Sequence, residues 1–283
     1  FGIYLCWQGL LAIFMLSTTR SFHYNFAMKF LIFLFLMACS FGSLLIGTLD
    51  DYVTSQTADR LQLYTKQETE LGKDVAKTFN ELKPQVKVIV ENLKKLKQQK
   101  AKKITEEIYQ PVGQNFVQAY QKSTQIISKY TQMMSDKQLD LFVKDFEKRI
   151  KKREKKLTIK RYKKKSPEKF EEIFGEIHEG QKEIIAEAAQ IFLDWNTNRH
   201  QTNVTLFNAL KAAQNKPNKK ELIQKAYLEV EVTIEKNFKT NIQPILSLIN
   251  QFLDTLNKEQ KEVINDKLET AIDILQAFIK HDF

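Results

Sequence analysis

Apolar residues recur at spacings of three, four and seven along most of this chain, for example at Val75, Phe79 and Leu82. This spacing matches the 3.6-residue period of an α-helix. No alternating run of apolar and polar residues is long enough to require a strand, and residues 227–234 are the most ambiguous segment. The 283 residues include only 8 Gly, too few for the frequent turns of a β-sandwich or barrel. The sequence therefore predicts an all-α fold.

Prolines predict where several helices are interrupted, because a proline disfavours helical geometry in the residue before it. Pro84 interrupts one apolar stripe, and Pro111 with Gly113 marks another break. Pro217 and Pro244 divide the chain ahead of residue 257. We therefore expect several helices joined by short connections.

Capping residues predict where helices begin. Residues 135–138 and 257–260 are capping boxes, in which the first and last side chains each bind a backbone N–H of the other. Residues 166–168, Ser-Pro-Glu, combine an N-cap, a proline suited to the first turn and an acid near the positive helix end. The apolar stripe that follows extends to Trp195. Together these boundaries predict a bundle of about six to nine helices, forming one domain over residues 39–283.

Residues 30–38 form an apolar run that fits the core of a secretory signal. The run is shorter than the roughly 18 to 20 residues that a membrane-spanning helix needs. It ends in Leu36-Met37-Ala38-Cys39, which resembles the lipobox of bacterial lipoproteins, where the cysteine receives a lipid on its sulfur and becomes the new N-terminus. We expect Cys39 to be the lipid attachment site, with residues 1–38 as signal and upstream segment and Met15 as the start.

The use of cysteine is consistent with a lipid anchor. The chain contains two cysteines, Cys6 and Cys39, and residues 39–283 keep only the second, so that part of the chain forms no internal disulfide. Acyl chains attach a protein to a membrane without spanning it. An ordinary cleaved signal, or an uncleaved apolar anchor, is the alternative interpretation.

The segment Leu49-Asp50-Asp51-Tyr52-Val53 follows soon after Cys39. With the helix starts described above, it resembles a family of uncharacterised, all-helical envelope lipoproteins of gram-negative bacteria. These proteins carry an Asp-Asp-Tyr-Val-like segment after the lipid cysteine and recurrent Leu-Thr-Pro-Glu-Gln-like helix starts. The resemblance covers most of residues 39–283 and implies an all-α protein anchored in the cell envelope, without implying an activity. Ser40 after the cysteine, in place of Asp, favours the outer membrane, facing the periplasm.

Residues 148–165 form the most basic part of the chain, with twelve Lys or Arg and one acid, Glu154. The whole chain carries a net charge of +10, so the basic character is concentrated in this run. Near an anionic membrane each Lys or Arg contributes about 1 kcal/mol of binding. We predict that the run forms a basic helix that contacts anionic lipid, lipopolysaccharide or an envelope protein. The basic residues are Lys148, Arg149, Lys151, Lys152, Arg153, Lys155, Lys156, Lys160, Arg161, Lys163, Lys164 and Lys165.

Two other interpretations of this run remain open. In the first, the run is a solvated helix whose charges pair with nearby acids such as Glu168 and Glu172. It could also bind nucleic acid, since neutralising phosphates needs similar charge. Export argues against nucleic acid as a partner, and Tyr162 is the one aromatic residue in the run that could stack on a base.

No motif in the sequence predicts catalysis. His178, His200 and His281 lack the spacing of metal ligands, and there is neither a Gly-x-Ser-x-Gly motif nor a glycine-rich phosphate loop. We therefore predict no metal, no cofactor and no enzymatic activity. The sequence favours a lipid-anchored cell-envelope protein with a binding or structural role. The alternatives are a periplasmic holdase-type chaperone, a hydrolase of envelope polymers and a secreted eukaryotic helical protein.

Overall fold

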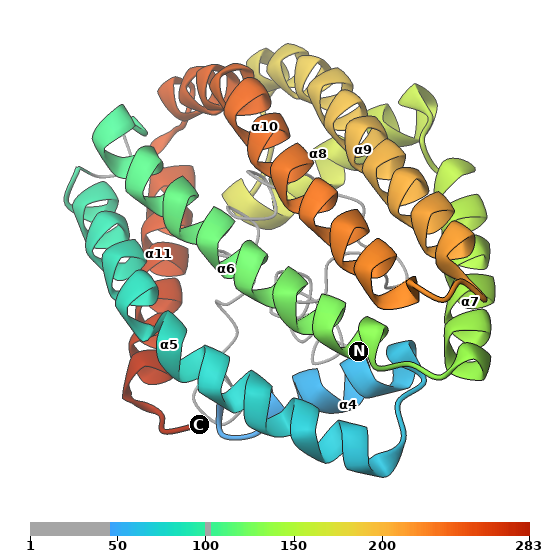
Figure 1. The fold of residues 1–283 in the computed structure, drawn as a ribbon. Helices are drawn as coiled ribbons and strands as arrows, with labels where there is room; N and C mark the ends of the chain where they lie inside the picture. Colours follow the sequence, from blue (N-terminus) through green and yellow to red (C-terminus); the bar gives the residue numbers. More distant parts are fainter. Residues whose placement is uncertain (1–45, 100–102) are drawn as a thin grey trace.

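The computed structural model describes residues 46–99 and 103–283, and every regular element in these two ranges is an α-helix (Figure 1). The prediction of an all-α, multi-helix bundle is confirmed. The lipobox residues Leu36 to Cys39 lie outside the described residues. The helices are α4 (Leu49–Leu61), α5 (Thr65–Gln98), α6 (Glu106–Gln132), α7 (Asp136–Glu154), α8 (Ile159–Phe174), α9 (Glu179–Ala213), α10 (Lys219–Asp254) and α11 (Lys258–Lys280).

Three of the predicted proline interruptions are wrong. α5 continues through Pro84, α6 through Pro111 and α10 through Pro244. Pro217, in contrast, lies between α9 and α10 as predicted. A proline inside a helix costs about 3 kcal/mol, because it removes one hydrogen bond and crowds the preceding turn. Each of these helices has buried residues on both sides of its proline, and burial of this apolar surface offsets the cost.

The helix predicted to run from Ser166 to Trp195 is two helices, so that boundary is also wrong. α8 begins earlier, at Ile159, and passes through Pro167. It ends at Gly175, which has a φ of 81°. Glycine adopts this positive φ without the steric penalty that a side chain brings, and such a residue commonly ends a helix. The apolar stripe continues across the break because α8 and α9 pack in the same core.

Both predicted capping boxes are present. At the start of α7, the Ser135 hydroxyl accepts from the backbone N–H of Gln138 at 3.3 Å, and Gln138 accepts from the backbone N–H of Ser135 at 2.9 Å. At the start of α11, the backbone N–H of Gln260 donates to the Asn257 side chain at 2.8 Å. Within the described residues, none of the helices combines the length and the apolar composition of a membrane span.

The described helices form two similar halves, α4–α7 and α8–α11. In chain order the helices contain 13, 34, 27 and 19 residues in the first half and 16, 35, 36 and 23 in the second. In both halves the first helix packs on the second and the second packs on the third. The third helices, α6 and α10, lie side by side and antiparallel at the centre of the molecule (Figure 1). The two halves are thus related by an approximate two-fold axis between α6 and α10.

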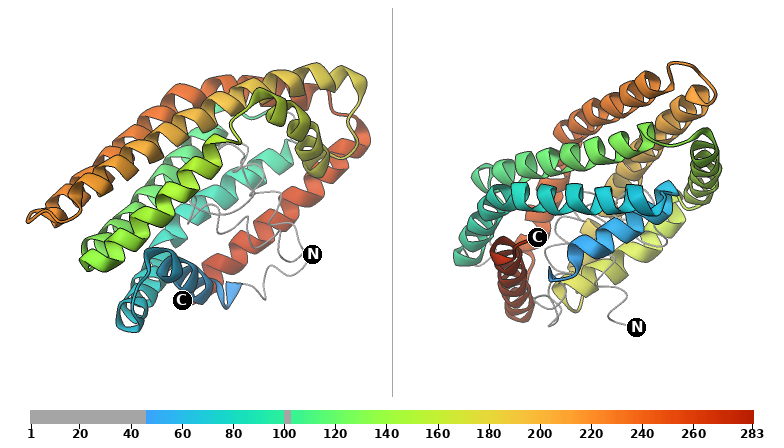
Figure 2. Two further views of the ribbon diagram at one scale, coloured as in Figure 1. Left: turned by 90° about the vertical axis from the view of Figure 1, so that its right-hand side faces the viewer. Right: turned by 60° about the horizontal axis from the view of Figure 1, so that its bottom comes forward.

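The last helix of each half packs on the other half. α7 lies along α9, and α11 lies along α5 (Figure 1). In the views of Figure 2, the start of α4 lies beside the C-terminus, and a Cβ on Gly47 would lie 4.0 Å from the ring of His281. At the central contact Gly113 lets α6 approach α10 closely, since a Cβ there would overlap the ring of Phe238. The core therefore extends continuously over both halves.

A pair of glutamines joins two helix starts in each half. In the first half Gln138 Nε2 donates to Gln67 Oε1 at 2.9 Å and to the backbone oxygen of Gln62 at 2.7 Å. In the second half Gln181 Nε2 donates to Gln260 Oε1 at 3.0 Å, and Gln260 Nε2 donates to the backbone oxygen of Glu176 at 2.7 Å. Each glutamine is the third residue of its helix. This repeated contact is independent support for the two-fold relation.

Candidate functional site

The basic run 148–165 was predicted to form one helix, and this prediction is wrong. The run instead spans the corner between two helices. α7 ends at Glu154, residues 155–158 form the turn, and α8 begins at Ile159. Two lysines of the run have acidic partners on their own helix: Lys151 pairs with Glu147 at 2.8 Å, and Lys165 pairs with Glu168 at 2.8 Å. Six others are exposed and form no ion pair with the described residues; we call them the corner lysines. They are Lys148, Lys152, Lys155, Lys160, Lys163 and Lys164.

The local electrostatics of the corner favour an anion. The first turn of α8 contains no acidic residue, although acids are the usual complement of the positive end of a helix. Lys160 and Arg161 stand at this end instead. Partial burial lowers the pKa of Lys156, and the positive charges of Arg161 and Lys152 lower it further. The basic groups of the corner are therefore close enough to repel one another, and an external anion would relieve that repulsion.

The two arginines of α7 within the run point into the molecule, away from the corner lysines. The side chain of Arg149 is 17% exposed, its Nε lies 3.2 Å from Asp145 Oδ2, and its guanidinium lies over the rings of Phe142 and Phe146. Arg153 donates from Nη2 to Asn196 Oδ1 at 3.2 Å. The surface that could meet an anionic partner is therefore narrower than the sequence predicts. Sequence periodicity could have indicated this, since Phe142, Phe146, Arg149 and Arg153 share a helix face.

These arginines belong to an interior group that the sequence analysis did not identify. Burial lowers the pKa of Arg153 well below its usual value, and the charge of Arg199 on α9 lowers it further. Burial also lowers the pKa of Arg60 on α4, with the charge of Arg149 as the next largest cause. Arg60 thus lies near Arg149, and Arg153 lies near Arg199, although the members of each pair are distant in sequence.

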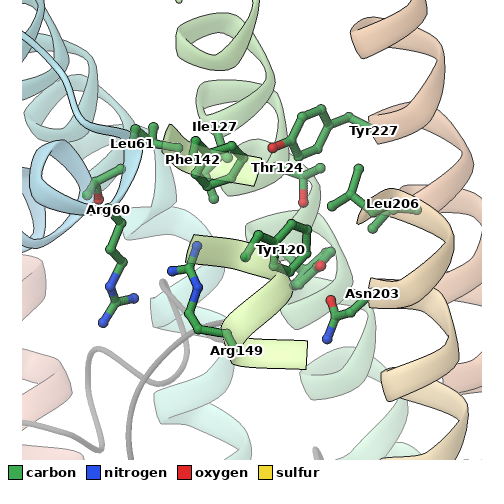
Figure 3. Close-up of a pocket in the computed structure, with 13 residues that line it drawn as sticks. Arg60, Leu61, Tyr120, Thr124, Ile127, Phe142, Arg149, Asn203, Leu206 and Tyr227 are labelled. Atoms are coloured by element: carbon green, nitrogen blue, oxygen red, sulfur yellow. The ribbon is translucent and has the colours of Figure 1, made fainter. Parts of the chain in front are cut away.

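A cavity of about 60 Å³ lies beside Arg60 and Arg149 (Figure 3). Its wall combines apolar side chains with hydroxyl and amide groups from α4, α6, α9 and α10. In Figure 3 the side chains of Arg60 and Arg149 lie to the left of Tyr120 and Asn203, with the Arg60 guanidinium group turned downward and that of Arg149 turned upward. We call this the arginine cavity. Its other polar lining residues are Thr57, Thr124 and Tyr227.

The remaining candidate residues do not form a site. His200 is buried, and burial lowers its pKa, with the charge of Arg153 as the next cause. Trp195 packs in the core at 9% exposure. Among residues 46–99 and 103–283 there is no group of His, Cys, Asp and Glu that could hold a metal ion. No protein-family model matches the chain, and comparisons with curated proteins and with solved structures give no significant match.

Proposed function

We propose that this protein is a lipid-anchored component of the cell envelope whose corner lysines bind the anionic head groups of a membrane. One observation supports the membrane contact above all: six exposed lysines lie on one corner of the fold without an acidic partner among the described residues. The lipobox-like segment ending at Cys39 supports the anchor, and the outer membrane, on its periplasmic side, is the proposed location. The role is one of binding, without catalysis.

The binding free energies favour two membrane attachments that act together, the acyl anchor and the corner lysines. At about 1 kcal/mol per lysine, the six corner lysines contribute up to about 6 kcal/mol. A single acyl chain gives only marginal, reversible binding to a membrane, so stable attachment takes two signals. A basic corner would supply the second signal and would also fix the orientation of the helical body on the surface.

The membrane contact is tested by vesicle co-sedimentation. The protein is mixed with vesicles of phosphatidylcholine, with or without phosphatidylglycerol. The six corner lysines are replaced by Gln in one variant, and the matched control replaces six exposed lysines elsewhere by Gln. We expect the corner variant to bind anionic vesicles at least about tenfold more weakly, and the control to bind like the wild type. The control lysines are Lys66, Lys73, Lys87, Lys94, Lys220 and Lys225.

Salt dependence provides a second readout of the same contact. At an ionic strength of about 0.5 M the screening length is only a few ångströms, so binding to anionic vesicles should be lost. Binding that is indifferent both to salt and to the six substitutions would overturn the membrane contact. The lipid anchor is tested separately, by metabolic labelling with a fatty acid: label should enter the wild type and not a Cys39→Ala variant.

A further inference from the structure

The arginine cavity concentrates positive charge in the interior, apart from the corner lysines. We infer that the arginine cavity binds a small oxyanion, a phosphate or carboxylate group, between Arg149 and the polar side chains of α6 and α9. The inference does not depend on the proposed membrane contact, because the two sites use different residues.

Arg149 brings a charge into the interior that is only partly compensated. Arg149 lines the cavity, and the carboxylate in contact with it is that of Asp145, whose side chain is 51% exposed. The Nη2 atom of Arg149 is buried and has no hydrogen-bond partner. A buried guanidinium group is stable only when its donors and its charge are satisfied. An oxyanion in the cavity would satisfy both.

The size and the chemistry of the cavity also suit a small oxyanion. A buried water needs roughly 10–15 Å³, so the volume of about 60 Å³ accommodates a few waters or one small oxyanion. Thr124 and Asn203 supply a hydroxyl and an amide donor from α6 and α9, and both side chains are visible in Figure 3. The planar fork of a guanidinium group matches the paired oxygens of a phosphate or a carboxylate. The apolar remainder of the wall lowers the local dielectric constant, which strengthens these contacts.

The second half of the molecule has apolar residues where the first half has Arg60, Arg149 and Arg153. When α7 and α11 are aligned on Gln138 and Gln260, the positions of Arg149 and Arg153 correspond to Ala271 and Leu275, which are buried. The last turn of α8, which corresponds to the turn with Arg60, contains the buried residues Ile173 and Phe174. In the second half Phe170, Phe174 and Phe252 pack together, with ring centroids 4.6 to 5.6 Å apart. The same architecture therefore packs without arginines, so their presence in the first half points to a ligand.

The test is the melting temperature of the whole protein in phosphate, acetate or chloride at matched ionic strength. A ligand that binds only the folded state raises the melting temperature in a saturable way. We expect phosphate or acetate to do so relative to chloride, and the more effective of the two identifies the ligand class. Arg149→Met keeps the apolar stem over Phe142 and Phe146 and should weaken the apparent affinity by about tenfold or more. The matched control, Lys137→Met, changes an exposed charge on the same helix outside the corner lysines and should leave the affinity unchanged.

Two further variants make the outcome decisive. If Arg149→Met does not fold, Arg149→Lys retains the positive charge but loses the fork, and should still weaken binding. The variant with six Gln at the corner lysines should keep the full effect, which separates the cavity from the corner. The inference is wrong if neither anion stabilises the wild type beyond chloride, or if the variants at Arg149 respond as the wild type does.

Discussion

At the scale of single residues, four glutamines, each the third residue of its helix, both cap that helix and join it to a second one. Each accepts a backbone N–H in its own helix start, and each side-chain amide contacts the glutamine of a second helix. Two of the four boxes have a conventional N-cap, Ser135 or Asn257, and were predicted from the sequence. The other two follow Tyr64 and His178, which are unusual caps, so these two boxes were not predicted from the sequence. The Gln that recurs three residues after each cap could have indicated these two boxes in the sequence.

Replacing Gln260 by Ala is expected to lower the free energy of unfolding by about 2 to 3 kcal/mol. Gln260 is 2% exposed, and its loss leaves the carbonyl of Glu176 without its side-chain donor and removes one hydrogen bond of the buried Gln181 amide, which keeps its contact with Thr255. Denaturation by urea, followed by circular dichroism, measures the change. The control Gln224→Ala removes an exposed glutamine on α10 and should stay within about 0.5 kcal/mol of the wild type. Equal effects of the two substitutions would contradict a stabilising role for the paired glutamines.

At the scale of elements, long helices continue through prolines that the local sequence marks as breaks. The penalty of a proline is local, whereas the burial that opposes it extends over the whole length of the helix. α5 illustrates this, since buried residues lie both before Pro84, at Phe79 and Leu82, and after it, at Val90 and Leu93. α5 packs on α6 and α11, and these contacts hold its two parts in line.

Pro84→Ala is expected to raise the free energy of unfolding by about 1 to 3 kcal/mol. Pro84 is exposed and lies inside a continuous helix, so alanine restores a backbone hydrogen bond and removes a steric clash without loss of packing. Thermal or urea denaturation detects the gain, with the exposed Lys87→Ala one turn later as the control. A decrease in stability would instead mean that α5 must bend at Pro84 to contact both of its neighbours.

At the scale of the whole molecule, the last helix of each half packs on the other half, so neither half is complete alone. α7 covers α9, α11 covers α5, and α6 packs on α10 between them. Burial at these contacts is shared between the halves, and a half without its counterpart would expose apolar surface.

The resemblance to an envelope lipoprotein family stays a prediction. The assignment of residues 39–283 to one domain also stays a prediction.

The two halves should therefore unfold in a single cooperative transition. Trp195 on α9 is buried and reports on the second half, while circular dichroism reports on the helices of both. In a Trp7→Phe variant, which leaves Trp195 as the chain's sole tryptophan, the two signals should give the same midpoint in urea. Two separated transitions would show that the halves fold independently.

The sequence by itself determined the helical class, the two conventional capping boxes and the position of the basic run, because these depend on residues a few positions apart. Only the tertiary structure decided that α5, α6 and α10 pass through their prolines, that Arg149 and Arg153 point inward, and that two similar halves exchange their last helices. The physical reason is the range of the interactions. Helical period and capping are local, whereas the partner that buries a helix face, or faces a charge, comes from a distant part of the chain.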